Sequence, residues 1–79
     1  MEIQFTEKQG QYLAFIYFYT KINGRPTAEK DMQSYFHVTP PSVHQMILTL
    51  ERLKLIERQP GVGRSIRVLV APESLPHLT

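Results

Sequence analysis

The spacing of apolar residues predicts a helix over residues 40–54, and the rest of the chain is organised around it. Thr39 precedes Pro40 and Pro41, a pattern typical of a helix start because a hydroxyl caps free N–H groups and proline fits a first turn. Helical periodicity places on one apolar face Val43, Ile47, Leu50 and Lys54, with Met46 and Leu53 at its edge. The opposite face carries Pro41, Ser42, Gln45, Leu48, Thr49 and Arg52. We therefore expect one side to face a core and the other to face a partner or solvent.

A first helix is predicted from Glu7 to Ile22, ending at Asn23-Gly24. Thr6 and Gln9 have the spacing of a capping box. The core face of this helix is expected to carry Tyr12, Leu13, Ile16, Tyr19 and Thr20. A second apolar stripe consists of Phe15, Phe18 and Ile22. A helix that is apolar nearly all round is buried nearly all round, so we expect this stripe to form a homodimer interface. The competing interpretation is that Phe15 and Ile22 pack under the C-terminal tail.

A second helix is predicted from about Ala28 to Phe36, with Thr27 as its cap and with Met32, Tyr35 and Phe36 on its apolar side. A tight connection at His37-Val38 then leads into the helix that begins after Thr39. Two helices joined by such a short turn form a helix-turn-helix.

Beyond Lys54 the periodicity changes from helical to alternating. Residues 55–59 and 65–70 read as two strands joined by a turn over residues 60–64, which is rich in glycine and carries Arg64. Alternation places Ile66 and Val68 on one face and Arg67 on the other. The fold class expected is therefore mainly α with a small β-hairpin: a winged helix-turn-helix with three helices and a wing with a basic tip. We assign residues 1–71 to this domain and residues 72–79 to a C-terminal tail, in which Leu75 and Leu78 either pack onto the domain or extend into solvent.

Composition excludes several classes of protein. The 79 residues contain no cysteine, so neither disulfides nor thiolate metal ligands are possible, and this fits a reducing cytoplasm. No apolar run is long enough to cross a membrane, and we expect a cytoplasmic protein with no membrane contact. The net charge is only +2, but basic residues are concentrated in the C-terminal half: Arg52, Lys54, Arg58, Arg64 and Arg67. This distribution favours a polyanionic partner on that side.

The candidate chemistry is that of double-stranded DNA binding. Gln45 is the first candidate for a base contact because its amide both donates to and accepts from adenine, and Ser42, Thr49 and His44 are further candidates. Phosphate contacts are expected from Arg52, Arg58, Arg64 and Arg67. The three histidines, at positions 37, 44 and 77, have no metal-site spacing, and no nucleophile elbow or phosphate-binding glycine loop occurs, so we expect no metal, no cofactor and no enzyme.

Residues 7–70 resemble the N-terminal winged-helix DNA-binding domain of LexA-type repressors. The resemblance is carried by KQGQYLAFI in helix one, the NGRPT link, VHQMILTLERLKLIE and the wing GVGRSIRVL. The segment VTPPSVHQMI also resembles the recognition helix of DtxR-type metal-dependent repressors. The LexA resemblance implies a transcriptional repressor and places the base-contacting positions at Thr39, Pro41, Ser42, His44 and Gln45.

Two departures from the LexA pattern affect these expectations. His44 and Gln45 stand where some members have acidic residues, so recognition of an SOS-type operator does not follow from the resemblance. No self-cleaving Ser-Lys peptidase domain follows in this sequence, so we expect a stand-alone domain that dimerises through helix one, with two recognition helices about 34 Å apart on DNA. The alternative function is a winged-helix protein-interaction module, in which outward Leu48 and the aromatic stripe bind a partner protein.

Overall fold

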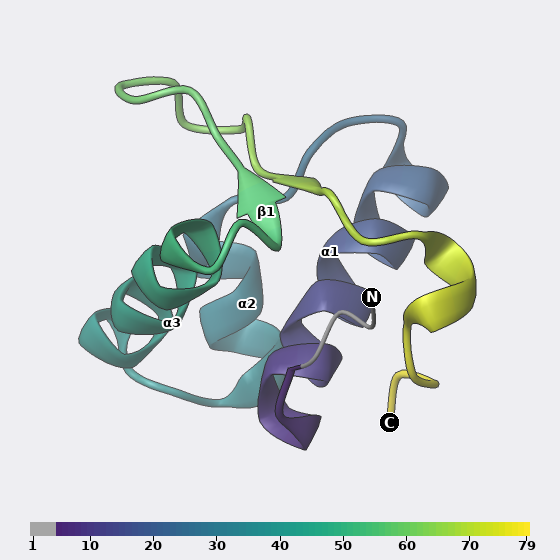
Figure 1. The fold of residues 1–79 in the computed structure, drawn as a ribbon. Helices are drawn as coiled ribbons and strands as arrows, with labels where there is room; N and C mark the ends of the chain where they lie inside the picture. The colour runs from purple at the N-terminus through teal and green to yellow at the C-terminus, as the bar shows by residue number, and fades with distance from the viewer. Residues whose placement is uncertain (1–4) are drawn as a thin grey trace.

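The computed structural model describes residues 5–79 and shows a three-helix domain with a short β-hairpin, the winged helix-turn-helix expected from the sequence. The elements are α1 (Glu7–Asn23), α2 (Glu29–Phe36), α3 (Pro40–Arg52), β1 (Ile56–Glu57), β2 (Arg67–Val68) and a 3₁₀ turn, η1 (Pro72–Ser74). In Figure 1, α3 and the loop between the strands lie on one side of the domain, and the C-terminal tail lies beyond α1 on the other. The tail thus lies on the opposite side of the domain from α3 and the wing loop, while the hydroxyl of Tyr35 in α2 donates to the carbonyl of Thr79 at its end.

Helix α1 begins and ends where local sequence chemistry requires. Thr6 Oγ1 accepts a hydrogen bond from the backbone N–H of Gln9, and the Gln9 side chain accepts one from the backbone of Thr6, so the predicted capping box is confirmed. At the other end, Gly24 adopts a φ of 71° and donates its N–H to the carbonyl of Thr20. A left-handed residue is most easily a glycine, which explains why the helix stops here.

The start of α2 differs from the prediction. Ala28 is the N-cap residue, and the capping oxygen is supplied by Asp31, whose carboxylate accepts the N–H of Ala28 at 2.9 Å. The Thr27 side chain, expected to cap the helix, is instead fully buried and donates to Asp31 at 3.3 Å. The carboxylate of Asp31, the third residue of the helix, thus takes the capping role expected of the Thr27 hydroxyl. It can do so because it accepts hydrogen bonds from both the Ala28 N–H and the Thr27 hydroxyl.

Helix α3 starts as predicted but ends two residues early. Thr39 precedes it with an extended backbone, and its hydroxyl accepts from the N–H of Ser42 at 3.4 Å. The helix ends at Arg52, and Lys54 has a φ of 61°. The expectation that Lys54 belongs to the apolar face is therefore wrong: the chain has already left the helix, and the Lys54 side chain is exposed.

The wing is a short antiparallel hairpin in which Ile56 pairs with Val68 and Glu57 pairs with Arg67. Its strands are shorter than the predicted 55–59 and 65–70. Ser65 explains part of the difference, because its hydroxyl accepts the N–H of Gln59 at 2.9 Å where a backbone carbonyl would otherwise bind. The predicted alternation holds at the base of the wing, with Ile66 buried and Arg67 exposed.

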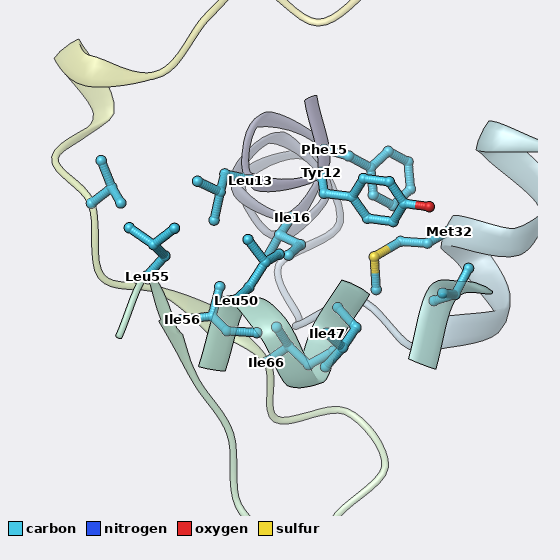
Figure 2. Close-up of a cluster of buried hydrophobic side chains, with 12 residues drawn as sticks. Tyr12, Leu13, Phe15, Ile16, Met32, Ile47, Leu50, Leu55, Ile56 and Ile66 are labelled. Carbon is cyan, nitrogen blue, oxygen red and sulfur yellow. The ribbon is translucent and has the colours of Figure 1, made fainter. Parts of the chain in front are cut away.

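The core lies between α1, α2, α3 and the base of the wing, as Figure 2 shows. Its fully buried members include Leu13, Ile16, Val43, Ile47 and Leu50. Tyr19 and Thr20, predicted on the same face of α1, are only partly buried. On α3, the burial of Val43, Ile47 and Leu50 confirms three of the four positions predicted for its apolar face.

The C-terminal tail folds back over the domain. The side-chain amide of Gln11 binds the tail at two points. Gln11 Nε2 donates to the carbonyl of His77 at 2.8 Å, and Gln11 Oε1 accepts the N–H of Thr79 at 2.9 Å. Leu75 and Leu78 pack against the core, which decides between the two alternatives left open by the sequence. The tail is therefore part of the folded unit.

Candidate nucleic-acid interface

The outer face of α3 is the principal candidate surface. Five of its six predicted members are exposed, and Thr49 is half-buried; the exposed ones are Pro41, Ser42, Gln45, Leu48 and Arg52. Their exposure follows from the burial of the opposite side of the helix, where Val43, Ile47 and Leu50 are inaccessible to solvent. A row of amide, hydroxyl and guanidinium groups on a helix that projects from the domain has the chemistry needed to read base edges.

One flank of this face borders a shallow groove between α3 and the start of α1. The groove is lined by Lys8, Gln9, Pro41, Ser42, Gln45, Met46 and Thr49. Next to the groove, the hydroxyl of Thr39 donates a hydrogen bond to the hydroxyl of Ser42 at 2.9 Å. The side chains of these two candidate base-contacting residues at the helix start therefore orient each other. Lys8 adds a positive charge to this flank that the sequence analysis did not consider.

The other flank carries a chain of four charged or polar side chains. His44 Nδ1 lies 3.3 Å from both carboxylate oxygens of Glu29, and Glu29 Oε2 lies 3.8 Å from Nη1 of Arg58. Arg58 Nε in turn donates to Glu51 Oε1 at 3.2 Å. The chain joins α2, α3 and the root of the wing, so Arg58 is held beside α3 and is balanced by two carboxylates.

Arg64 does not extend from the wing tip. Its Nη1 lies within hydrogen-bonding distance of Asp31 (3.0 Å), Tyr19 (3.2 Å) and the carbonyl of Pro26 (3.3 Å). The expectation of a basic tip is therefore wrong at this residue, because partly buried acceptors from α1, from the α1–α2 link and from α2 attract the guanidinium inward. Arg64 fastens the wing to α1 and α2.

Asp31 is the centre of this attachment, and its charge contributes to stability. Partial burial alone would raise its pKa, but hydrogen bonds from the Ala28 N–H and from Arg64 outweigh that effect, and the pKa lies below its ordinary value. A depressed carboxyl pKa means that the stabilisation is present at neutral pH and is lost as the pH falls through the folded-state pKa.

Replacing Asp31 with asparagine is expected to lower the free energy of unfolding by about 1–3 kcal/mol at pH 7, because the charged hydrogen bond to Arg64 is lost. Below about pH 4 the difference from the wild type should shrink, since the wild-type carboxylate is then being protonated. Urea unfolding monitored by circular dichroism at a series of pH values measures both effects. An unchanged difference across the pH range would contradict the assigned role of the carboxylate.

Two further arginines complete the set. Arg67 forms an ion pair with Glu57 across the wing and is highly exposed. Arg52 lies on the outer face of α3, and among residues 5–79 it forms no ion pair with a carboxylate. Of the four arginines predicted to meet phosphates, Arg52 is thus the one whose charge the fold leaves unbalanced.

The second stripe on α1 divides into two parts. Phe15 is only 8% exposed and packs against Tyr35 and Phe36, with ring centroids 4.8 and 5.7 Å away. Phe18 and Ile22, in contrast, are exposed, Ile22 at 79%. Neither original interpretation describes this arrangement fully: α2 covers Phe15, and Ile22 is not under the tail.

Sequence reasoning missed the acidic partners of the interface: Glu29, Asp31 and Glu51. Their positions in the first turn of α2 and in the last turn of α3 are ordinary for helices, so periodicity offered no signal. An unequal pattern of charge was visible, because five basic residues follow Glu51 with Glu57 as the only acid among them. The charge pattern alone does not show that acids from earlier in the chain balance two of these basic residues: Glu29 and Glu51 pair with Arg58, and Asp31 pairs with Arg64.

Among the described residues, no helix has the length and apolar character needed to span a bilayer. Within the same part of the chain, no group of three or more histidine and carboxylate side chains is arranged to hold a metal ion.

Comparison with known proteins places these features in context. No protein-family model matches the chain. The LexA repressor of Thermosipho melanesiensis is 36% identical over 70 residues, covering 89% of this chain and 35% of the relative. The LexA repressor of Thermosipho africanus is 33% identical over 72 residues (91% and 36%), and that of Thermotoga maritima is 32% identical over 63 residues (80% and 32%). The chain thus spans about a third of the length of the curated relatives that it matches.

Proposed function

Since the chain is a relative of the LexA repressors over most of its own length, we propose that it binds double-stranded DNA and acts as a transcriptional repressor. In this proposal α3 enters the major groove and the wing lies along the phosphate backbone. Repression would follow from occupation of a promoter. The observation that carries the proposal is the solvent-facing side of α3, where Gln45 and Arg52 point away from the core.

Base contacts are assigned to Thr39, Ser42, His44, Gln45 and Thr49. Gln45 stands first because it lies near the middle of the outer face and its amide can form the paired hydrogen bonds that adenine offers. Thr39 and Ser42 lie at the helix start, where recognition helices commonly approach bases. His44 and Thr49 occupy opposite flanks of the same face.

Phosphate contacts are assigned first to Arg52, which pairs with no carboxylate in the part of the chain that the structure describes. Arg67 is 70% exposed and can reach a phosphate by exchanging the Glu57 carboxylate for a phosphate oxygen. Arg58 is only 26% exposed and would have to leave the carboxylates of Glu29 and Glu51 to do the same. For Arg64 the same exchange would release the wing from Asp31, so its contribution to binding is expected to be mainly the placement of the wing. The sequence offered the four arginines as equal candidates, and the contacts of the fold now rank them.

Replacing Arg52 with alanine is expected to weaken binding to all duplexes by a similar factor and to reduce the slope of log affinity against log salt by about 1, the effect of losing one phosphate contact. Lys30→Ala is the matched control, because it removes an exposed cation from α2, outside the proposed surface. Fluorescence anisotropy titrations at several salt concentrations measure the slopes. Equal slopes for the wild type and Arg52→Ala would remove Arg52 from the interface.

The proposed function itself is tested by titrating a labelled random duplex with the wild-type protein at about 50 and 200 mM salt. Several phosphate contacts should make the affinity fall by at least about tenfold between these conditions. A protein that binds no duplex DNA at either salt concentration, or whose affinity is the same at both, would not be a DNA-binding repressor.

We also propose that two copies associate through the exposed part of α1, which presents Phe18 and Ile22. Apolar side chains exposed on neighbouring turns of one helix commonly mark a contact surface. A twofold dimer would present two copies of α3 to half-sites about 34 Å apart on a palindromic duplex. Phe15 is expected to support this surface from within the core.

Replacing Phe18 with glutamate is expected to shift the protein from dimer to monomer, because two buried like charges would face each other across a twofold axis. Sedimentation velocity at high micromolar concentration measures the change. Leu69→Glu serves as the control, since Leu69 is exposed to a similar degree as Phe18 but lies outside α1. A wild-type protein that sediments as a monomer under these conditions would rule out the interface.

One observation favours a second function, a protein-interaction module. Leu48 is exposed in the middle of the outer face of α3, and carboxylates balance three of the arginines nearby, so this surface is less cationic than the sequence indicated. An interaction module would bind its partner through Leu48 and would show no salt-sensitive affinity for duplex DNA. The titration with random duplex therefore separates the two functions.

A further inference from the structure

The contact between His44 and Glu29 bears on how the proposed interface would read DNA. His44 lies on the flank of α3, with about half of its side chain exposed, and its Nδ1 atom lies 3.3 Å from both oxygens of the Glu29 carboxylate. Only one of the two ring nitrogens is engaged in this way. The other, Nε2, has no hydrogen-bond partner among the described residues and remains free to meet a ligand.

The Glu29 carboxylate is itself held in place. It lies in the first turn of α2, where the free N–H groups of a helix favour a negative charge. Arg58 Nη1 lies 3.8 Å from Oε2, on the side of the carboxylate toward the wing. Glu29 is therefore a fixed acceptor between His44 and Arg58, with contacts to two other elements of the fold.

A carboxylate can only accept hydrogen bonds, and this determines which tautomer of the ring it favours. In a neutral imidazole one nitrogen carries hydrogen and the other carries a lone pair. If Nδ1 donates to Glu29, Nε2 must carry the lone pair and can only accept. The partner of a metal-bound or catalytic histidine fixes its tautomer by the same rule.

The tautomer decides which base His44 can read. In the major groove, adenine N6 and cytosine N4 present donors, while guanine N7 and O6 and thymine O4 present acceptors. We propose that Glu29 is a positioning residue that fixes His44 with Nε2 as an acceptor, so that His44 selects an amino group of adenine or cytosine. This inference rests on the proposed DNA-binding function and deepens it.

The tautomer can be measured without DNA. Nitrogen-15 NMR of the His44 ring, recorded at about pH 8 where an ordinary imidazole is neutral, distinguishes protonated from unprotonated ring nitrogens. The wild type is expected to carry its hydrogen on Nδ1. In Glu29→Gln the side-chain amide can either donate or accept, so the ring should shift toward a mixture of tautomers. A wild-type ring with its hydrogen on Nε2 would overturn the inference and leave the proposed function standing.

Selection of bound sites from a random duplex pool tests the consequence for recognition. The wild type is expected to prefer adenine or cytosine over guanine or thymine by about tenfold at one position, and His44→Ala should abolish this preference at that position alone. Glu29→Gln should reduce the preference to within about twofold while retaining preferences elsewhere in the site.

Glu51→Gln is the matched control, because it removes an equal charge from the same chain of contacts without touching His44. It should leave the preference intact. Equal changes in Glu29→Gln and Glu51→Gln, or an unchanged preference in Glu29→Gln, would overturn the role of Glu29. A wild-type protein that selects no site at all would instead refute the proposed function, and this inference with it.

Discussion

Replacing Leu50 with alanine is expected to lower the free energy of unfolding by about 2–5 kcal/mol, the range for deleting a fully buried leucine side chain. Leu50 is inaccessible to solvent and lies in the core cluster between α1 and the base of the wing. The loss combines apolar surface returned to water with a cavity that close-packed neighbours cannot fill. Thermal unfolding should shift downward by at least about 10 °C.

Leu48→Ala provides the comparison for this experiment. It removes the same atoms from the same helix two residues away, where the side chain is 36% exposed, and leucine and alanine have similar helix propensities. Its cost should stay within about 1 kcal/mol. Similar losses for Leu48 and Leu50 would mean that α3 is rotated relative to the core, and the proposed interface would then face the wrong way.

Replacing Gln45 with alanine is expected to relax the sequence preference by about 1–3 kcal/mol at a single base pair, roughly five- to 150-fold in affinity ratio. The side chain is exposed on the outer face of α3 and borders the groove beside Lys8. Loss of its amide would remove hydrogen bonds to one base edge and leave the phosphate contacts in place. Quantitative binding to a set of single-base variants of the selected site measures the change.

Comparison with Arg52→Ala shows whether Gln45 reads a base or only contributes to overall affinity. A phosphate contact carries no sequence information, so Arg52→Ala should weaken all site variants alike. Gln45→Ala should change one position and leave the salt slope as in the wild type. If Gln45→Ala weakened every duplex equally, its side chain would contribute to affinity without reading a base.

The fold was largely predictable because local signals agreed with one another. The capping box at Thr6, the Thr39-Pro40 start of α3 and the change of periodicity after Lys54 each reappear in the structure near the expected residue. The cap of α2 was less predictable: Asp31 took the role expected of Thr27, because its carboxylate accepts from Ala28 and Thr27 and also from the distant Arg64.

The candidate site was predictable on α3 and less so on the wing. Burial of Val43, Ile47 and Leu50 fixes which side of α3 faces outward, and helical periodicity alone reveals this. The direction of an arginine, in contrast, depends on acceptors distant in sequence: Arg64 lies 33 residues from Asp31 and 45 from Tyr19. The pairing of Arg58 with Glu29 and Glu51 follows the same rule, since no local pattern encodes it.

In the proposed function, duplex DNA contacts the outward side of α3 together with the wing. Titration of nitrogen-15-labelled protein with a duplex, followed by backbone amide NMR, tests it residue by residue. The largest shifts are expected from Ser42 to Arg52 and from Arg58 to Arg67, with little change at Phe18 and Ile22 when the protein concentration keeps the oligomeric state constant. Shifts confined to α1 and the tail, with α3 unaffected, would contradict the claim.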